Sequence, residues 1–552
     1  MPPHKLFLSR LVGISVLGCI ARSLATELAC GPDDRTCSAD IDELSALQVL
    51  LAVNSTSASA RTSSSRVAPL CSNGRVCPHI FMVLSDDLGW WNVPWHNPDM
   101  QPYMPTTMEL VGQGIELDRH YGFFACAPSR ASLLSGRFPV NIVSQSLDKL
   151  DDASFGLPID ITAFPQKLKE AGYATHMVGK WHAGHASTKQ LPKARGFDSF
   201  LGYFSGGEDH FTQEATDAEN LKDFWEQNAT YSGPAYQQAA SAYGDRQFFE
   251  HVVQIVQAHS AEQPLFYYVA FQNPHAPLQA PSNMLQGFPT DWTSGREKYA
   301  GMVRFLDGAM RNIVEALKHR DMWQHTLFVF SSDNGAYSSG NNWPLIGEKA
   351  QPFEGGVRLA AFISGGFIPS SLRGTKQEGY MHLADWYATF CNLAGVDPFD
   401  ATAAAAGLAP VDSVNLWPLI SGSVAESPRQ EMPLYVGGAE RNALISGRYK
   451  LVSWNSRYAQ WAPDCPTLTT PCPRWGMSDC TEGCVYDILA DPSEASDISK
   501  EVPGVTFQLL ARMTELRIGM QDYPSTPETV LAWTVWRSKY NGFLGPWLDL
   551  DG

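Results

Sequence analysis

Residues 79–89 read His-Ile-Phe-Met-Val-Leu-Ser-Asp-Asp-Leu-Gly, an apolar run of strand length that ends in an acidic pair. Similar apolar runs occur further along the chain, at residues 174–178, 265–271, 327–331 and 359–364. Helical patterns separate them, over residues 164–171, 246–259 and 299–318. Near-continuous apolar strands that alternate with helices predict an α/β fold with a mostly parallel sheet, sandwiched between helices on both faces.

The residues that follow these strands are polar or charged. Asp86 and Asp87 follow the first strand, and the later strands are followed by Lys180 and His182, by His275, and by Asp333 and Asn334. Ligands of parallel sheets bind beyond the carboxyl ends of the strands. We therefore expect these side chains to meet at one edge of the sheet, where they would form a functional site.

The oxygen-bearing members of this group predict a metal site. Asp86, Asp87, Asp333 and Asn334 offer carboxylate and amide oxygens, which suit Ca²⁺ or Mg²⁺ better than zinc. An isolated Asp-Asp pair would be read as a helix cap or a turn. Here Ser-Asp-Asp-Leu-Gly follows one strand and Ser-Asp-Asn-Gly follows another. This repetition favours a metal, and the flexible geometry favours Ca²⁺ over Mg²⁺.

A second informative stretch, residues 126–137, reads Cys-Ala-Pro-Ser-Arg-Ala-Ser-Leu-Leu-Ser-Gly-Arg. A cysteine that acts as a thiol nucleophile usually has a histidine or a helix dipole nearby, and no histidine is adjacent to Cys126 in the sequence. The stretch resembles the modification signal of the type I sulfatases, with Ser135 where threonine is common. In that family an enzyme oxidises the cysteine to Cα-formylglycine, whose hydrated aldehyde is the nucleophile. The alternative is an ordinary Cys-x-Pro turn that leads into a helix.

Other segments resemble the same family and occur in the family's order across residues 79–358. They are the two acidic segments, Gly179-Lys-Trp-His-Ala-Gly184, Asn273-Pro-His-Ala-Pro277 and Gly340-Asn-Asn-Trp-Pro-Leu-Ile-Gly-Glu-Lys349. Each match alone is weak, because lone histidines and lysines are usually structural or solvated. Together they imply an alkaline-phosphatase-like fold. The amino-acid sequence of residues 85–90 and 340–345 is most similar to that of the arylsulfatase B group of this family.

The resemblance also implies a role for each side chain. The catalytic residues would be Arg130, Lys180, His182 and Cys126, the last in its formylglycine form. His275 and Lys349 would bind the sulfate group. The calcium ion would be held by Asp86, Asp87, Cys126, Asp333 and Asn334. The metal and Arg130 would lower the free energy of the attacking oxygen anion. The assignment of acid and base among His182, His275 and Lys349 can be permuted.

The two ends of the chain differ from its middle in their pattern of apolar and polar residues. A signal peptide is predicted over residues 1–25. It is indicated by the basic residues Lys5 and Arg10, an apolar stretch at 11–21 and small residues at 23–25. An extension is expected at 26–75, with a short helix at 41–53 and a Ser-rich linker at 54–65. The catalytic domain is predicted at 76–430. A smaller C-terminal α+β domain with an antiparallel sheet is predicted at 431–552. It is indicated by apolar runs at 432–436 and 449–453 and by a helical pattern at 505–519.

Cysteine usage agrees with an exported protein. Eight of the eleven cysteines form two groups and would give four disulfides in an oxidising compartment: Cys30, Cys37, Cys71 and Cys77, and Cys465, Cys472, Cys480 and Cys484. Their spacing lacks the paired Cys-x-x-Cys of structural zinc sites. Cys391 lies in an apolar helical pattern and is expected to be a buried thiol. With the predicted signal peptide, this cysteine usage favours a protein of the secretory pathway, secreted or lysosome-like, in which Asn54 and Asn228 would be N-glycosylation acceptors.

The bulk composition restricts the partners. A net charge of −17 argues against a nucleic-acid-binding protein, which needs a basic face. No stretch after the signal has the length and apolar character of a stable membrane anchor. The expected partners are a sulfated small molecule or glycan as substrate and a formylglycine-generating enzyme during maturation.

The sequence thus predicts a sulfuric ester hydrolase that acts on aryl sulfates and sulfated glycans. Two alternatives stay open. One is a phosphodiesterase or phosphonate hydrolase of the same superfamily, which shares the fold. The other is an inert protein that binds anions or glycans because Cys126 is not modified. A thiol enzyme that uses Cys126 directly comes last, since it would leave the acidic residues without a role.

Overall fold

The structure is a computed structural model that describes residues 68–142, 150–236, 242–437, 441–454, 458–459, 475–476, 479–518 and 529–548. Several predictions fall outside these residues. They are the signal peptide, the helix and linker of the extension, the glycosylation signal at Asn54, and the cysteines Cys30, Cys37, Cys465 and Cys472.

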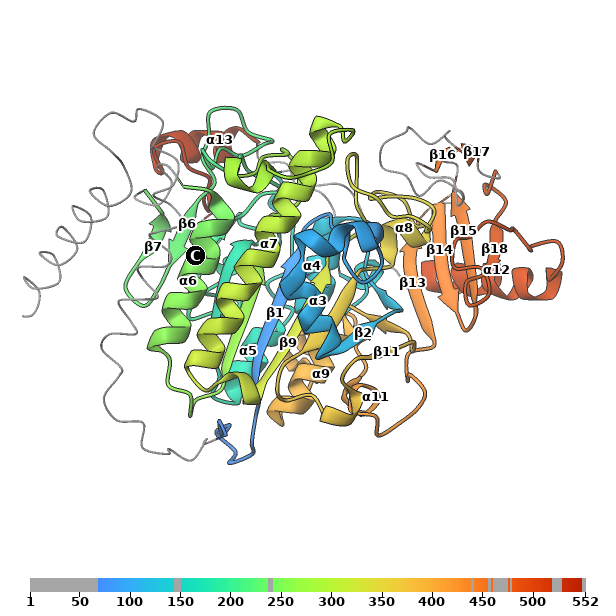
Figure 1. The fold of residues 1–552 in the computed structure, drawn as a ribbon, viewed down its shortest axis with the longest axis horizontal. Coiled ribbons are helices and arrows are strands. Elements are labelled where there is room, and N and C mark those ends of the chain that lie inside the picture. The colour runs from blue at the N-terminus through green and yellow to red at the C-terminus, as the bar shows by residue number, and fades with distance from the viewer. Residues whose placement is uncertain are drawn as a thin grey trace, which may run out of the picture. The chain divides into compact units, whose positions relative to one another are not determined.

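A ten-stranded sheet forms the centre of the fold, in the order β11-β2-β10-β9-β1-β8-β4-β5-β6-β7 (Figure 1). Its middle consists of β1 (His79–Ser85), β4 (Ala174–Lys180), β8 (Leu265–Ala270) and β9 (Thr326–Ser332). These four strands are parallel neighbours, and β1, β8 and β9 are buried along their whole length. The predicted parallel sheet is confirmed, and burial on both faces explains why its strands read as continuous apolar runs.

The outer part of the sheet is built from shorter strands. They are β2 (Ile115–Leu117), β5 (Ser199–Tyr203), β6 (Trp225–Gln227), β7 (Ser232–Pro234), β10 (Ala361–Ser364) and β11 (Thr375–Gln377). β5 continues the parallel arrangement, whereas β10 is antiparallel to both β9 and β2, and β6 is antiparallel to β5 and β7. Apart from β10, these strands were not predicted, because three to five residues are too few for a periodic pattern to emerge.

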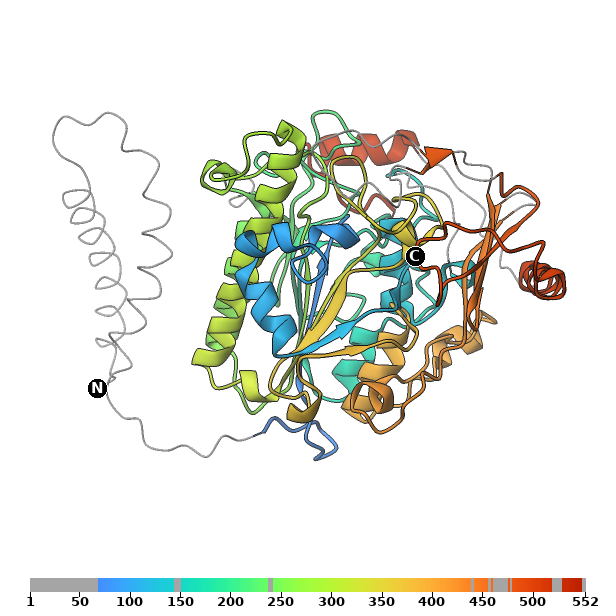
Figure 2. The same cartoon turned by 45° about the vertical axis from the view of Figure 1, so that its right-hand side comes forward.

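Helices cover both faces of this sheet (Figures 1 and 2). One layer contains α3 (Pro105–Gly112), α6 (Gly244–Ala258) and α7 (Ser294–His319). The other contains α4 (Cys126–Ser135), α5 (Phe164–Glu170) and α9 (Asp385–Ala394). The three predicted helices are confirmed as α5, α6 and α7. α7 begins five residues before its predicted start, since the Thr293 side chain caps it by accepting the Arg296 N–H.

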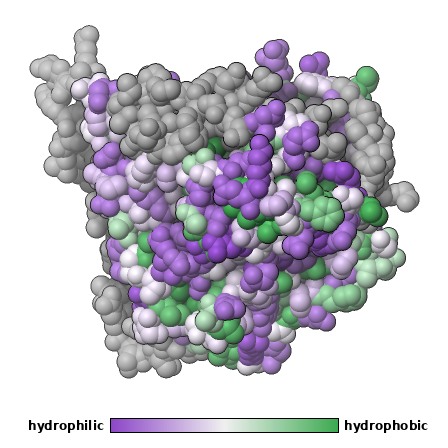
Figure 3. All heavy atoms as spheres, turned by 90° about the vertical axis from the view of Figure 1, so that its right-hand side faces the viewer, coloured by the Kyte–Doolittle hydropathy of each residue, from purple (hydrophilic) through white to green (hydrophobic). Residues whose placement is uncertain are grey.

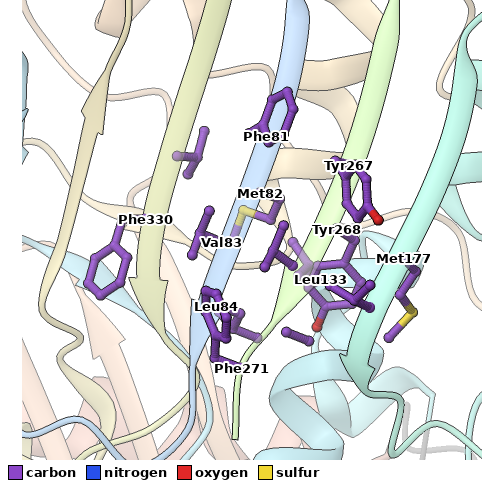
Figure 4. Close-up of a cluster of buried hydrophobic side chains, with 14 of the residues drawn as sticks. Phe81, Met82, Val83, Leu84, Leu133, Met177, Tyr267, Tyr268, Phe271 and Phe330 are labelled. Carbon is purple, nitrogen blue, oxygen red and sulfur yellow. The ribbon is translucent and has the colours of Figure 1, made fainter. Parts of the chain in front are cut away.

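The main hydrophobic core lies between the sheet and the helices. Figure 4 shows side chains of β1, from Phe81 to Leu84, among Met177, Tyr268 and Phe330 of the neighbouring strands and Leu133 of α4. All of these side chains are fully buried. Burying one side chain of this size contributes about 1.5–3 kcal/mol. Packing through Leu133 therefore fixes α4, whose first residue is Cys126, against the central strands.

A separate antiparallel sheet follows in the chain, in the order β13-β14-β15-β18. Its strands are β13 (Glu431–Val436), β14 (Arg441–Ser446), β15 (Tyr449–Trp454) and β18 (Cys484–Asp487), and α12 (Pro503–Ile518) packs against them. The smaller C-terminal antiparallel sheet is thus confirmed. On the face that carries it, hydrophilic and hydrophobic side chains mix over short distances (Figure 3).

Short elements complete the described fold. They are β3 (His120–Tyr121), α8 (Glu354–Val357), β12 (Met381–His382), α10 (Ala401–Ala405), α11 (Trp417–Ile420), β16 (Tyr458–Ala459), β17 (Trp475–Gly476) and α13 (Thr529–Ser538). α13 lies beside β6 and β7 and not with the C-terminal sheet (Figure 1). The residues after it continue this contact, since Leu544 and Gly542 pair with the backbone of Lys222 and Tyr540 packs on Trp225.

Two disulfides join cysteines that are close in sequence, Cys71 to Cys77 and Cys480 to Cys484. Cys391 is a buried free thiol, as predicted. Within the described ranges, no helix combines the length and the apolar character needed to cross a membrane.

Candidate active site

Cys126 is the first residue of α4, and every residue of this helix is buried. The Ser129 hydroxyl holds the entering chain, because it accepts the Phe123 N–H at 2.9 Å and donates to the Phe123 carbonyl at 3.0 Å. Gly136, with a φ of 68°, ends the helix in the left-handed conformation. The Cys-x-Pro-Ser-Arg stretch thus places the thiol at a helix N-terminus, where negative charge is favoured.

Lysine and histidine side chains from distant segments surround the thiol. They are Lys180, His182, His275 and Lys349. Burial raises the pKa of Cys126, but the charges of the two lysines and hydrogen bonds from the two histidines outweigh this effect. They hold the pKa of Cys126 well below its usual range. Position 126 is therefore a place where an anion is strongly stabilised.

The acidic residues form a network beside these cations. Asp87 has a φ of 61° and donates its N–H to Asp333 Oδ1 at 3.2 Å, while Asn334 Nδ2 donates to Asp87 Oδ1 at 2.6 Å. Lys180 Nζ lies 2.5 Å from Asp86 Oδ2. The ends of β1 and β9 therefore bring the four predicted oxygen ligands together, and the end of β4 adds a lysine.

The oxygen donors of this network fit a hard divalent cation, and a thiol and an imidazole lie beside them. Asp86, Asp87, Cys126 and His275 each offer one ligand atom, and these atoms all lie within 4.8 Å of one another. Asp86 Oδ1 and Asn334 Oδ1 are buried without a hydrogen-bond partner among the described residues, which is unusual for buried oxygens. Burial and the charge of Asp86 raise the pKa of Asp333 to about 6. A calcium ion would satisfy these oxygens and relieve the repulsion between the carboxylates.

Arg130 is fully buried and holds this network in place. Its Nε and Nη2 groups donate to Asp333 Oδ2 at 3.1 and 2.8 Å, and its Nη1 donates to the Lys180 carbonyl at 3.1 Å. Nη2 also lies 3.5 Å from Asp86 Oδ2. Arg130 thus joins α4 to the ends of β9, β1 and β4, and it neutralises part of the acidic charge.

The segment that carries Lys180 and His182 depends on a glycine. Gly179 has a φ of 88°, and a Cβ at this position would lie 1.8 Å from the carbonyl oxygen of Ala270 on β8. Only glycine allows this close approach of β4 and β8. His182 itself has a φ of 48°, and its ring lies 5.6 Å from the ring of Phe155. The turn after β4 is therefore a constrained one.

Some residues that shape the site were not predicted. Asp245, in the first turn of α6, accepts the N–H groups of Gln272 and Asn273 at 3.0 and 2.9 Å and so orients the segment that carries His275. Burial raises the pKa of Asp245 to about 7. Tyr299 donates its hydroxyl to the Asp87 carbonyl at 2.7 Å. In the sequence an acid in a first helical turn resembles an ordinary helix cap, so no signal marked Asp245.

Comparison with known proteins bears on this arrangement. The model of the Sulfatase family matches residues 78–396, which contain Cys126 and all the residues gathered around it. The chain belongs to the sulfatase family. Arylsulfatase J of Mus musculus is 30% identical over 503 residues, which cover 85% of this chain and 80% of the relative. N-acetylgalactosamine-6-sulfatase of Homo sapiens is 27% identical over 395 residues, which cover 68% of this chain and 72% of that protein.

Solved structures show the same architecture. The crystal structure of Ps i-CgsB has a TM-score of 0.67 and 25% identity, and the match covers 84% of this sulfatase and 97% of that chain. The phosphonate monoester hydrolase of Agrobacterium radiobacter has a TM-score of 0.50 and 17% identity, with 80% and 95% covered. This second likeness shows a shared fold alone, which agrees with the alkaline-phosphatase-like architecture implied by the sequence.

The site of this sulfatase is open on one side. The side chains of His275 and Lys349 are 17% and 18% exposed, whereas those of Lys180 and Arg130 are fully buried. Cys126 itself is 7% exposed. His275 and Lys349 are therefore more accessible than Lys180 and Arg130.

Proposed function

We propose that this sulfatase hydrolyses sulfate esters with a formylglycine, made from Cys126, and a calcium ion. The position of Cys126 carries the proposal, because it lies at a helix N-terminus among two lysines and two histidines and beside four oxygen ligands. The hydrated aldehyde would supply the attacking hydroxyl, and a bound cation would make such a hydroxyl easier to deprotonate. Asp86, Asp87, Asp333 and Asn334 would hold the cation.

Lys349 and His275 are suited to bind the sulfate group of the substrate. Both are partly exposed at the open side, and both face Asp87, at 2.7 Å from Lys349 Nζ and 3.7 Å from His275 Nε2. Burial lowers the pKa of His275, but the charges of Asp86 and Asp87 raise it above its usual value. A protonated His275 has a proton to give to the departing oxygen.

His182 is suited to the opposite task. It hydrogen-bonds position 126 from the enclosed side, where it can accept a proton from residue 126 when sulfate leaves. Lys180 contacts Asp86 and compensates negative charge next to residue 126. Arg130 holds Asp333 and so positions an oxygen ligand of the cation. These assignments give each of the buried charged groups of the site one role.

We propose sulfated glycans, together with small aryl sulfates, as the substrate class. One relative is an N-acetylgalactosamine-6-sulfatase, and Ps i-CgsB has been solved in complex with a neocarrahexaose. The similarity of residues 85–90 and 340–345 to arylsulfatase B also favours a sulfated amino sugar. His275 and Lys349 are partly exposed, which agrees with a substrate that extends beyond its sulfate group into solvent.

We also propose that the protein matures in the secretory pathway. The sequence of residues 1–25 favours export, and the disulfides Cys71–Cys77 and Cys480–Cys484 agree with an oxidising compartment. Asn228 is half-buried at the turn between β6 and β7, next to exposed residues 229–231, and would carry a glycan there. A formylglycine-generating enzyme would act on Cys126 before folding, because Cys126 is buried in the folded chain.

The test combines mass spectrometry with turnover. The peptide that contains residue 126 should carry an aldehyde in place of the thiol, and the protein should hydrolyse an aryl sulfate much faster than the matching phosphate ester or phosphonate ester. Cys126→Ala is the control and should be inactive. An unmodified thiol in active protein would contradict the proposal, and preferential turnover of the phosphorus esters would assign the chain to the alternative reaction.

A further inference from the structure

The C-terminal residues 529–548, here called the C-terminal strap, pack on the loop that carries His182. The N–H groups of Trp547 and Leu548 both donate to the Ala186 carbonyl, at 2.9 and 2.8 Å. Ser187 forms a parallel β-bridge with Leu548. The strap therefore adds backbone hydrogen bonds to a loop only four residues beyond His182.

Aromatic rings of the strap also enclose His185 in the same loop. The ring of His185 stacks on Trp536 at 6.0 Å and meets the edge of Trp547 at 5.1 Å, while Phe204 stacks on it at 5.4 Å. His185 and the two tryptophans are buried. Trp536 Nε1 donates to the Gly545 carbonyl at 2.7 Å, which keeps the strap in shape. His185 is thus fixed in a preformed aromatic box.

The loop needs such support because of its backbone. A φ of 48° at His182 is unfavourable for a residue other than glycine and costs about 1–3 kcal/mol, so it persists only where the surroundings impose it. Directly after His182, the Leu157 N–H donates to the Ala183 carbonyl at 2.9 Å. Three residues further along, the strap holds Ala186. Both anchors therefore fix the chain immediately after His182.

The strap also holds a second segment that faces His182. The Lys222 N–H donates to the Gly542 carbonyl, and the Leu544 N–H donates to the Lys222 carbonyl, both at 2.8 Å. The next residue, Asp223, is fully buried and acts electrostatically on His182. The same strap therefore fixes the loop of His182 and the segment of its acidic neighbour.

We infer that the C-terminal strap is a positioning element of the active site, in which Trp547 and Trp536 hold His185 and Ala186 and thereby keep His182 directed at residue 126. The inference rests on the proposed function, because it concerns a residue that the proposed reaction uses. Trp547 and Trp536 are positioning residues, since they act through the loop. This explains why the chain returns from the C-terminal sheet to the catalytic domain in its last described residues.

The test compares Trp547→Ala and Trp547→Phe with Val530→Ala, a control on the exposed side of α13, where Val530 is 82% exposed. Trp547→Ala should lower kcat by about 10- to 100-fold, because a misplacement of about 1 Å has effects of this size. KM should change less than about threefold, since His275 and Lys349 lie outside the loop. Trp547→Phe should restore most of the kcat, and Val530→Ala should match the wild type.

Hydrogen exchange gives a second readout that does not need activity. Amides of residues 181–187 should exchange faster in Trp547→Ala than in Val530→Ala, while those of β1 keep wild-type protection. A kcat within threefold of the wild type in folded Trp547→Ala would overturn the inference, as would unchanged exchange. If Trp547→Ala does not fold, Trp547→Leu is judged by the same two criteria. If the wild type lacks sulfatase activity, the proposed function fails, and the exchange of residues 181–187 alone decides the inference.

Discussion

Lys349 Nζ lies 2.7 Å from Asp87 Oδ1, so the proposed sulfate-binding lysine touches a proposed metal ligand. The segment of Lys349 is also joined to the entrance of α4, because the N–H of the next residue, Ala350, donates to the Phe124 carbonyl at 2.7 Å. Burial lowers the pKa of Lys349, but Asp87 and Cys126 raise it well above the usual value. Lys349 therefore stays charged throughout the physiological pH range and is held between the metal site and position 126.

Replacing Lys349 by alanine should reduce kcat/KM for an aryl sulfate by about 10²–10³-fold, as removal of one preorganised donor to a developing charge does. The loss should exceed that of Lys298→Ala, which changes an exposed lysine on α7. Steady-state kinetics of the two purified variants measure this difference. A Lys349→Ala variant with wild-type kcat/KM would show that Lys349 does not bind the sulfate group.

Calcium should stabilise the folded protein. Asp86, Asp87 and Asp333 are buried close together, and ligand binding to the native state alone adds about 2.7 kcal/mol at a concentration of 100 times Kd. Chelation should therefore lower the thermal midpoint, and added Ca²⁺ should restore it more completely than Mg²⁺. Asp333→Asn should weaken this response. A thermal midpoint that changes neither with the chelator nor with added calcium would contradict the proposed metal site.

The gathering of Cys126 and the acidic residues at one place could be predicted because two short patterns mark them. Cys126 lies in a contiguous motif, and Asp86 and Asp333 each follow an apolar strand directly, so the rule for parallel sheets places them at one edge. Tyr299 contacts Asp87 from 212 residues away along the chain, and its helix position has no local feature that shows this contact. Contacts of this kind depend on packing and not on a pattern.

The same limit applies to the fold. β1 was predicted because it is buried on both faces, whereas β6 and β7 are three-residue strands at one end of the sheet. The C-terminal strap was missed for a further reason. Trp536 and Trp547 fall within residues 431–552, which the sequence places in the C-terminal domain, and nothing local to them indicates which surface they pack against. Long-range pairing with Lys222 and Ala186 decides their place.

The protein should lose stability as the pH falls below about 6.5. Burial, followed by the charges of His259 and His325, lowers the pKa of His79 to about 3. Between pH 6.5 and 3 the unfolded chain thus binds a proton at this residue that the folded chain does not bind. Stability is fully present above pH 6.5 and falls with decreasing pH, by up to about 1.4 kcal/mol per pH unit for each such group.

His79→Asn isolates this contribution. Its side-chain oxygen can accept the Leu265 N–H, as His79 Nδ1 does at 3.2 Å, but it does not titrate. The variant should show a shallower decline of the thermal midpoint between pH 7.5 and 4.5 than the wild type. The same slope in both proteins would show that His79 does not contribute.

The C-terminal sheet should depend on a buried ion pair for its attachment. Lys450 of β15 lies 2.9 Å from Glu354 of α8 and 2.8 Å from Glu494, and all three side chains are fully buried. Lys450→Met would leave Glu494 without this cation, and Glu354 with the more distant Arg358, whose Nη1 lies 3.7 Å away. Removing one partner of such a pair costs about 3–5 kcal/mol. Urea unfolding should therefore shift to a much lower midpoint.

The double variant Lys450→Met/Glu494→Gln distinguishes this effect from a simple packing defect. It removes the orphaned charge of Glu494, so it should be more stable than Lys450→Met alone, although Glu494→Gln by itself gains nothing. Lys298→Ala again serves as the control. Additive effects of the two substitutions would mean that Lys450 and Glu494 do not interact. A midpoint of Lys450→Met near that of the wild type would mean that another contact attaches the sheet.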